Sequence, residues 1–172
     1  MRILKLLVLV FVVSFLAGCG STGSESGYTA ASLYDNGIET VSVDMFESDS
    51  FRRGVEFELT QALVERIGAN TPYKICQDKK ESDSVIYGRI LSVKERVMNY
   101  QRELDRPMQE QVVVLAEVTW KDLRSGKLLL DRQQFRFSGN YSALQNDSIE
   151  VATREAVNKM AVDIVEAMET GW

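Results

Sequence analysis

The side chains that carry out most enzyme chemistry are missing from this sequence or lack a recognisable arrangement. There is no histidine among the 172 residues, which removes the usual general base, the Ser-His and Cys-His nucleophile pairs and the commonest metal ligand. Acidic residues are plentiful, but no spacing singles out a catalytic pair, and charged side chains mostly stay in solvent. No glycine-rich phosphate loop, metal-ligand spacing or nucleophile elbow is found. We therefore expect a protein that is not an enzyme and has no metal site or cofactor.

The cysteine at position 19 suggests a different chemistry, because it ends a signal-peptide pattern. Residues 1–18 contain two cations, Arg2 and Lys5, then an apolar run, then small residues, an order typical of a secretory signal peptide. A transmembrane helix, the alternative, needs about 20 mainly apolar residues, and here the run stops before the cysteine. The segment Leu16-Ala17-Gly18-Cys19 resembles the bacterial lipobox, in which the cysteine sulfur is acylated and the preceding peptide is removed.

Lipidation of Cys19 would anchor the chain to a membrane without spanning it. Each buried methylene contributes ~0.8 kcal/mol and a single chain binds only marginally, so stable anchoring needs two or three acyl chains. The next residue is Gly20, whereas an aspartate there retains a lipoprotein in the inner membrane under the enterobacterial sorting rule. These features predict a lipid-anchored protein of the outer membrane that faces the periplasm.

The composition of the mature chain excludes further classes. Removal of residues 1–18 takes away two cations and no acids, so the formal charge of −5 becomes −7, with 18 Lys and Arg against 25 Asp and Glu. An acidic domain of this kind is not expected to bind nucleic acid through bulk electrostatics. Cys76 is then the only unmodified cysteine, so no intramolecular disulfide can form and stability must come from the core.

The remaining sequence predicts a tether followed by one domain. Residues 19–36 contain the lipidated cysteine and a segment rich in Gly, Ser, Thr and Ala, which is typical of a flexible tether. Residues 37–172 are enough for a single domain with its own core. The periodicity of apolar residues there predicts, in order, a strand at 38–46, a helix at 51–67 begun by capping residues 48–50, a short strand at 73–76, long strands at 84–98, 110–121 and 128–138, and a helix at 148–168 capped by Asp147.

The order of these elements indicates the fold class. The three long strands are neighbours in sequence, with a tight turn at 122–127 ("DLRSGK"), and therefore predict an antiparallel meander. Simple alternation in the strand 84–98 places Tyr87, Arg89, Val93 and Glu95 on one face. Each helix has one apolar stripe, so the expected fold is α+β, a two-layer α/β sandwich whose four- to five-stranded, mostly antiparallel sheet has two helices packed on one face. The other face must be in solvent or covered by a partner.

The predicted first helix carries candidate partner contacts. Arg52 and Arg53 lie at its expected start, where each exposed cation opposes the helix dipole by ~0.3–1 kcal/mol. An ion pair from Arg52 to Glu56, one turn on, is the alternative explanation for one of them. Phe57 lies on the side of the helix away from the apolar stripe and is a candidate contact, although single exposed apolar residues are common and need no function.

Cations also gather in the middle of the chain, against its acidic trend. Between residues 89 and 106 they outnumber the acids, and such a basic end of a sheet could bind phosphorylated sugars through charge-assisted hydrogen bonds. The alternative is an ordinary solvated strand face. The candidates for glycolipid contact are Lys94, Arg96, Arg102 and Arg106.

Two longer segments carry a resemblance to a known family. Residues 51–75, "FRRGVEFELTQALVERIGANTPYKI", and 118–132, "VTWKDLRSGKLLLDR", together with the lipobox, resemble the lipopolysaccharide-assembly lipoprotein family LptE in a divergent form. The resemblance implies an outer-membrane lipoprotein with a two-layer α/β fold that sits inside the large β-barrel translocon LptD, helps it assemble and contacts lipopolysaccharide. It also implies that basic residues at strand ends and loops meet the glycolipid.

Two other classes of lipoprotein have domains of similar size and element order. LpoB-like proteins regulate cell-wall synthases, and CsgG-like proteins form secretion pores. A pore subunit should carry an additional amphipathic pair of strands for membrane insertion, which the sequence does not indicate. Recovery of a large barrel or of a penicillin-binding protein after mild detergent extraction would separate the first interpretation from these alternatives.

Overall fold

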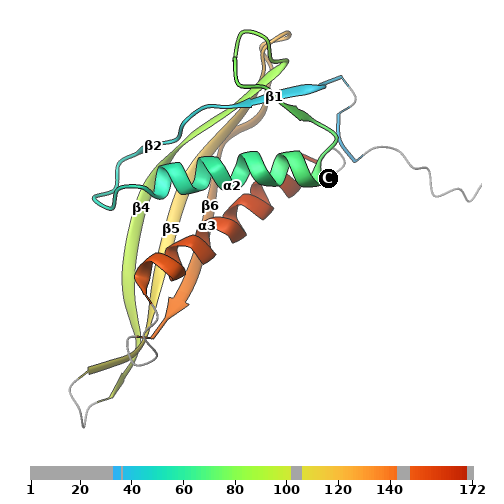
Figure 1. Ribbon diagram of the computed structural model, residues 1–172. Coiled ribbons are helices and arrows are strands. Elements are labelled where there is room, and N and C mark those ends of the chain that lie inside the picture. Colours follow the sequence, from blue (N-terminus) through green and yellow to red (C-terminus); the bar gives the residue numbers. More distant parts are fainter. Residues whose placement is uncertain (1–32, 36, 102–105, 143–147, 170–172) are drawn as a thin grey trace, which may run out of the picture. The chain divides into compact units, whose positions relative to one another are not determined.

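The computed structural model describes residues 33–35, 37–101, 106–142 and 148–169 (Figure 1). Three of the predicted sites fall outside the described residues, namely Cys19, Arg102 and the side chain of Arg106. The described part contains, in chain order, β1 (Thr40–Val43), β2 (Glu47–Ser48), α2 (Val55–Asn70), β3 (Lys74–Ile75), β4 (Ser84–Gln101), β5 (Arg106–Asp122), β6 (Leu128–Tyr141) and α3 (Ile149–Glu166).

The strands form one mixed sheet in the order β3-β1-β4-β5-β6, with β2 also paired to β4. The meander β4-β5-β6 is antiparallel as expected, but β1 is parallel to both β3 and β4, and β2 is parallel to β4. The prediction of four to five mostly antiparallel strands is therefore correct for the long strands and slightly off elsewhere, because the sheet has six strands and its short pairings are parallel. The physical reason is that α2 returns the chain to the end of the sheet where β1 began, which makes β3 parallel to β1.

Strand β3 falls within the short strand expected at 73–76, whereas β2 was not recognised as a separate strand. The expected strand 38–46 is divided, because β1 ends at Val43 and pairing with β4 resumes only at Glu47. The Asp49 N–H then donates to the Ile90 carbonyl at 2.9 Å, so the chain still follows β4 where helix capping was expected. As a result α2 begins at Val55, and the cations at 52 and 53 precede the helix.

The ends of both helices differ from the expected caps. Gly54 is the N-cap of α2, with φ 96 and no side-chain cap, a left-handed conformation that glycine adopts without steric cost. At the start of α3 the cap is Ser148, whose side chain accepts a hydrogen bond from the Val151 N–H at 3.3 Å. The predicted cap, Asp147, lies outside the described residues.

Both helices cover one face of the sheet, as the apolar stripes predict (Figure 1). The alternate residues of β5 that point toward the helices are fully or almost fully buried, and so is the stripe of each helix. This two-layer core needs no contribution from the opposite face. Its main members are Val55, Leu59, Leu63, Ile67, Val112, Val114, Ala116, Val118, Trp120, Ala156, Val157, Met160, Ala161, Ile164 and Met168.

A β-bulge in β4 changes which residues share a face. Ile90 pairs with Ala116 and Ser92 with Leu115, so Leu91 is an extra residue on β4. Beyond it the alternation is reversed: Val93 is opposite the core residue Val114 and thus lies on the helix side. The prediction that Tyr87, Arg89, Val93 and Glu95 share one face is therefore wrong.

Candidate functional site

The face of the sheet that the helices leave uncovered carries most of its polar side chains, and it is hollowed in two places. Its residues occupy the alternate positions of β4, β5 and β6 that point away from the core. We call the two depressions the mixed-charge hollow, with a volume of about 840 Å³, and the basic trough, of about 400 Å³.

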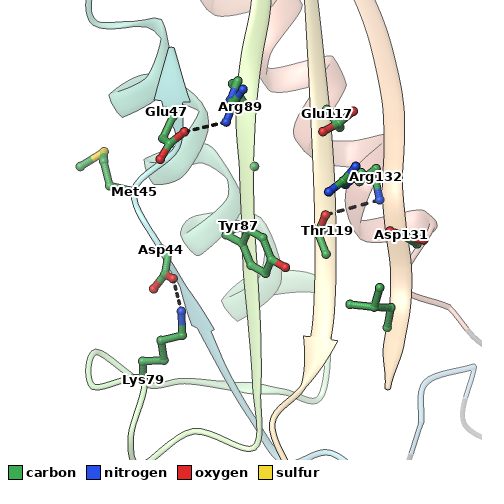
Figure 2. Close-up of a pocket in the computed structure, with 12 residues that line it drawn as sticks. Asp44, Met45, Glu47, Lys79, Tyr87, Arg89, Glu117, Thr119, Asp131 and Arg132 are labelled. Carbon is green, nitrogen blue, oxygen red and sulfur yellow. Dashed lines mark hydrogen bonds and ion pairs between the residues drawn. The ribbon is translucent and has the colours of Figure 1, made fainter. Parts of the chain in front are cut away.

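The mixed-charge hollow contains both signs of charge (Figure 2). Two of its cations are paired at the rim. Lys79 Nζ lies 2.6 Å from Asp44 Oδ2, and Arg89 Nη2 lies 3.1 Å from Glu47 Oε2. Lys79 is also placed over the Tyr87 ring, 5.8 Å from its centroid, where a cation is attracted to the aromatic face. The full lining is Asp44, Met45, Glu47, Lys79, Tyr87, Gly88, Arg89, Glu117, Thr119, Leu128, Asp131 and Arg132.

Arg132 occupies an unusual place in this hollow. Between Gln133, paired with Val118, and Leu130, paired with Trp120, β6 has two residues against the single Thr119 of β5. Arg132 is one of those two, and it has φ 48, a left-handed conformation that non-glycine residues rarely adopt. Its N–H donates to Thr119 Oγ1 at 3.4 Å, and its side chain extends back over β5 (Figure 2).

The basic trough lies on the same uncovered face. Its cations are Lys94, Arg96 and Arg136, and none of its seven lining residues is acidic. The other lining residues are Ser92, Val113, Leu115 and Gln134. Three cations around two aliphatic side chains can bind a phosphorylated group that is attached to an apolar one.

The sequence analysis identified two of the three trough cations. Lys94 and Arg96 were expected at the basic end of the sheet, and the structure places both in the trough. Arg136 was missed because it is distant in sequence; it reaches the trough through the pairing of β6 with β5, in which it is opposite Leu115. The sequence did contain a signal for Arg136, because the predicted hairpin brings the strand 128–138, which contains Arg136, beside the strand 110–121.

The other predicted contact residues do not join the trough. Arg52 forms ion pairs with Glu95 (Nη2 to Oε1, 2.8 Å) and Glu150 (Nη1 to Oε1, 3.8 Å) rather than with Glu56. It therefore links the loop before α2 to β4 and α3. Arg53 is exposed, as is Phe57, whose exposed fraction is 57%. These residues belong to the helix layer, and their role as partner contacts stays a prediction.

Membrane spans and metal centres are two other features that the described residues could contain. None of the helices in this part of the chain combines the length and apolar character needed to cross a membrane. The same residues contain no group of three or more His, Cys, Asp or Glu side chains placed to hold a metal ion.

Comparison with known proteins relates the sequence to one family. The sequence model of the LptE family, described as lipopolysaccharide-assembly, matches residues 38–169. A comparison with curated proteins finds no match. The matched range contains both hollows and every described candidate residue.

One solved structure shares the fold at low sequence identity, and two lipoproteins have lower structural similarity. The hypothetical protein CT253 from Chlamydia trachomatis has a TM-score of 0.53 and 9% identity, over 75% of this chain and 94% of that chain. Lipoprotein B from Nitrosomonas europaea has a TM-score of 0.49 and 18% identity, over 75% and 78% of the two chains. The rare lipoprotein B from Shewanella oneidensis has a TM-score of 0.48 and 14% identity, over 76% and 93%.

Proposed function

This chain belongs to the LptE family of lipopolysaccharide-assembly proteins, and from this premise we propose that it is the lipid-anchored partner of an LptD-like β-barrel in the outer membrane. In this role it contacts lipopolysaccharide during transport and contributes to outer-membrane assembly. Its work is binding and positioning rather than catalysis, in agreement with the non-enzymatic role of the family.

The basic trough is the observation that carries the glycolipid part of this proposal. The mature chain is acidic, yet three cations and no acid line this one depression. Lipopolysaccharide has phosphorylated sugars joined to acyl chains, and guanidinium and ammonium groups form charge-assisted hydrogen bonds with phosphate oxygens. Val113 and Leu115 between the cations provide an apolar floor for the adjoining part of the ligand.

The uncovered sheet face supports the barrel part of the proposal. A two-layer domain needs only one face of its sheet for its own core, which leaves the other free to meet a second protein. The lipobox at Cys19 adds an anchor at the membrane that holds the barrel. Anchoring confines both proteins to one surface and raises their effective concentration.

Charge reversal in the basic trough tests the glycolipid contact. We expect the double variant Lys94→Glu, Arg136→Glu to bind purified lipopolysaccharide at least about tenfold more weakly than wild type, since loss of about 1.4 kcal/mol corresponds to a factor of ten. The wild-type affinity should also fall as salt rises, because exposed charges are screened. Affinity is measured with the mature lipoprotein in mild detergent by titration with fluorescent lipopolysaccharide.

The matched control is the double variant Lys80→Glu, Lys127→Glu, which reverses two exposed cations in turns outside the trough and changes the net charge by the same amount. Equal weakening by this variant would show that net charge alone governs binding and would contradict the trough assignment. The same preparations report the protein partner. Recovery of an LptD-like barrel supports the proposed partnership, whereas recovery of a penicillin-binding protein would favour regulation of a cell-wall synthase.

A further inference from the structure

The mixed-charge hollow differs chemically from the basic trough beside it. Three large apolar side chains line it and remain exposed, with exposed fractions of 57% for Met45, 38% for Tyr87 and 41% for Leu128. Exposed apolar groups that gather in one depression indicate a binding surface, whereas single ones do not. Tyrosine, methionine and arginine are also the residues enriched in protein interfaces.

The charges of the hollow distinguish between possible ligands. Lys79 and Arg89 are already paired with acids at the rim, whereas Arg132 has no ion pair with any of the described residues. Four acids also line the hollow, so a ligand that carries several phosphate charges would be repelled there more strongly than a single carboxylate. A polypeptide fits better, because it presents carboxylates, hydrogen-bond donors and apolar side chains together.

The backbone at Arg132 gives a second, independent observation. With φ 48 it adopts a conformation that glycine would adopt at no steric cost. The bulge therefore needs no arginine for its own geometry, and the side chain makes the position less stable than glycine would. Strain of this kind persists where the side chain has a use, and it clusters at functional sites.

We propose that the mixed-charge hollow is the docking site for a polypeptide segment of the protein partner. In this arrangement an acidic side chain of the segment pairs with the Arg132 guanidinium, and neighbouring apolar side chains pack on Tyr87 and Leu128. The inference rests on the proposed function, which supplies an LptD-like barrel as the partner. It divides the uncovered face into a glycolipid site, the basic trough, and a protein site, the mixed-charge hollow.

Arg132→Gly is the decisive variant, because it removes the guanidinium and relieves the backbone strain at once. The lipidated full-length protein is co-expressed with the LptD-like barrel of the same organism and purified in mild detergent. We expect barrel recovery to fall about tenfold or more, as for loss of an interface hot spot, and lipopolysaccharide binding to stay unchanged. The thermal midpoint of the variant alone should rise by about 2–4 °C.

Gln133→Gly is the matched control. Gln133 is the exposed neighbour on β6 and does not line the hollow. Glycine at an ordinary strand position weakens the strand, so this variant should melt at a lower temperature than wild type and recover the barrel normally. Arg132→Gly should thus be more stable than wild type and recover less barrel, whereas Gln133→Gly should be less stable and recover the barrel normally. This contrast would identify Arg132 as a strained residue that is retained for binding.

Several results would overturn the proposal. If wild type recovers the barrel and Arg132→Gly recovers as much, the hollow is not the docking site, although the proposed function stands. If Arg132→Gly loses lipopolysaccharide binding and keeps the barrel, or if it abolishes self-association instead, the occupant is a glycolipid or a second copy. If wild type recovers no barrel, the proposed function fails and this inference fails with it.

A photocrosslinking residue in place of Tyr87 identifies the occupant directly. The structure places this side chain at the wall of the hollow (Figure 2). Irradiation of the complex followed by peptide mapping should yield a crosslink to a segment of the barrel that contains Asp or Glu beside an apolar residue. A crosslink to lipopolysaccharide or to another copy of this chain would contradict the proposal.

Discussion

Asp83 holds β1 beside the start of β4 through its carboxylate. Asp83 Oδ2 accepts hydrogen bonds from the N–H groups of Glu39 and Thr40, both at 3.0 Å, and the Asp83 N–H donates to Thr40 Oγ1 at 2.8 Å. These bonds to the carboxylate lower the pKa of Asp83, and Arg124 contributes less. A single side chain thus aligns two parallel strands whose direct pairing is short.

Replacement of Asp83 by alanine should therefore destabilise the domain. Hydrogen bonds to a charged group contribute about 1.5–3 kcal/mol, and we expect a loss in that range at neutral pH, measured by urea unfolding. Asp83→Asn, which keeps an acceptor oxygen without the charge, should lose less. Equal stability of the alanine variant and wild type would show that the β1–β4 pairing does not depend on this carboxylate.

The pH dependence of this difference follows from the lowered pKa. The contribution of Asp83 is fully present above the unfolded-state pKa, near 3.9 for aspartate, and is lost as the pH falls through the lower folded-state pKa. Wild type and Asp83→Ala should thus differ most at neutral pH and converge in acid. A difference that grew in acid would contradict the assigned direction of the shift.

Close packing of α3 on β6 depends on the absence of a side chain at Gly139. A β-carbon there would collide with the backbone of Ala152, including its carbonyl oxygen. Backbone atoms in a helix cannot move aside as a flexible side chain can, so the two elements would have to separate. Gly139 thus fixes how closely the helix layer approaches the edge strand.

Gly139→Ala should destabilise the domain by about 1–3 kcal/mol, the usual cost of overpacking, as measured by thermal unfolding. Gly68→Ala is the control, and it should increase the stability of the domain. A β-carbon at Gly68 meets only Ile75 Cγ1 at 4.0 Å, and alanine is better than glycine within a helix by roughly 0.5–1 kcal/mol. Similar effects of the two substitutions would show that the contact between α3 and β6 is not tight.

Elements with a long, regular apolar pattern could be predicted from the sequence. The alternation in β5 and the stripe of α3 place their buried residues correctly, because one face of each meets a continuous core. Strands β2 and β3 have two residues each; β3 lies within the short strand expected at 73–76, whereas β2 is too short for any alternation to separate it from β1. Their parallel pairing depends on the path of α2, which local sequence does not specify.

The candidate sites were predictable only where their residues follow one another along a strand. Lys94 and Arg96 are two residues apart on β4, so their charge was visible as a cluster. Arg136 and Arg132 join the uncovered face through pairing with β5. The bulge at Leu91 reverses the faces of β4, and a single extra residue has no signature in the periodicity.

The first described residues of the domain lie beside its helix layer, not on its candidate binding face. The Tyr34 hydroxyl lies 3.3 Å from both the Asn70 carbonyl oxygen and Glu169 Oε1, either of which can accept its single proton. The chain therefore enters the domain beside the last residues of the helix layer, whereas both hollows lie on the uncovered face of the sheet.

Lipidation at Cys19 is a premise of the proposed function, and it is tested on protein extracted from cells. We expect mass spectrometry to find the mature chain beginning at residue 19, with an added mass of two or three acyl chains. An unmodified thiol at this position would contradict the lipobox assignment. The measurement is independent of the hollows, because residue 19 precedes the domain.

Replacing Cys19 alone could leave an uncleaved signal peptide that still binds the membrane. The informative variant therefore joins residues 20–172 to a cleavable secretory signal peptide, so that the same domain is exported without acyl chains. It should move from the membrane to the soluble periplasmic fraction and recover less barrel from cells, since the effective concentration at the membrane is lost. When purified and mixed with the barrel, it should bind as tightly as the lipidated form, because the proposed contacts lie in the domain. Weaker binding of the purified variant would place part of the interface in the lipidated terminus.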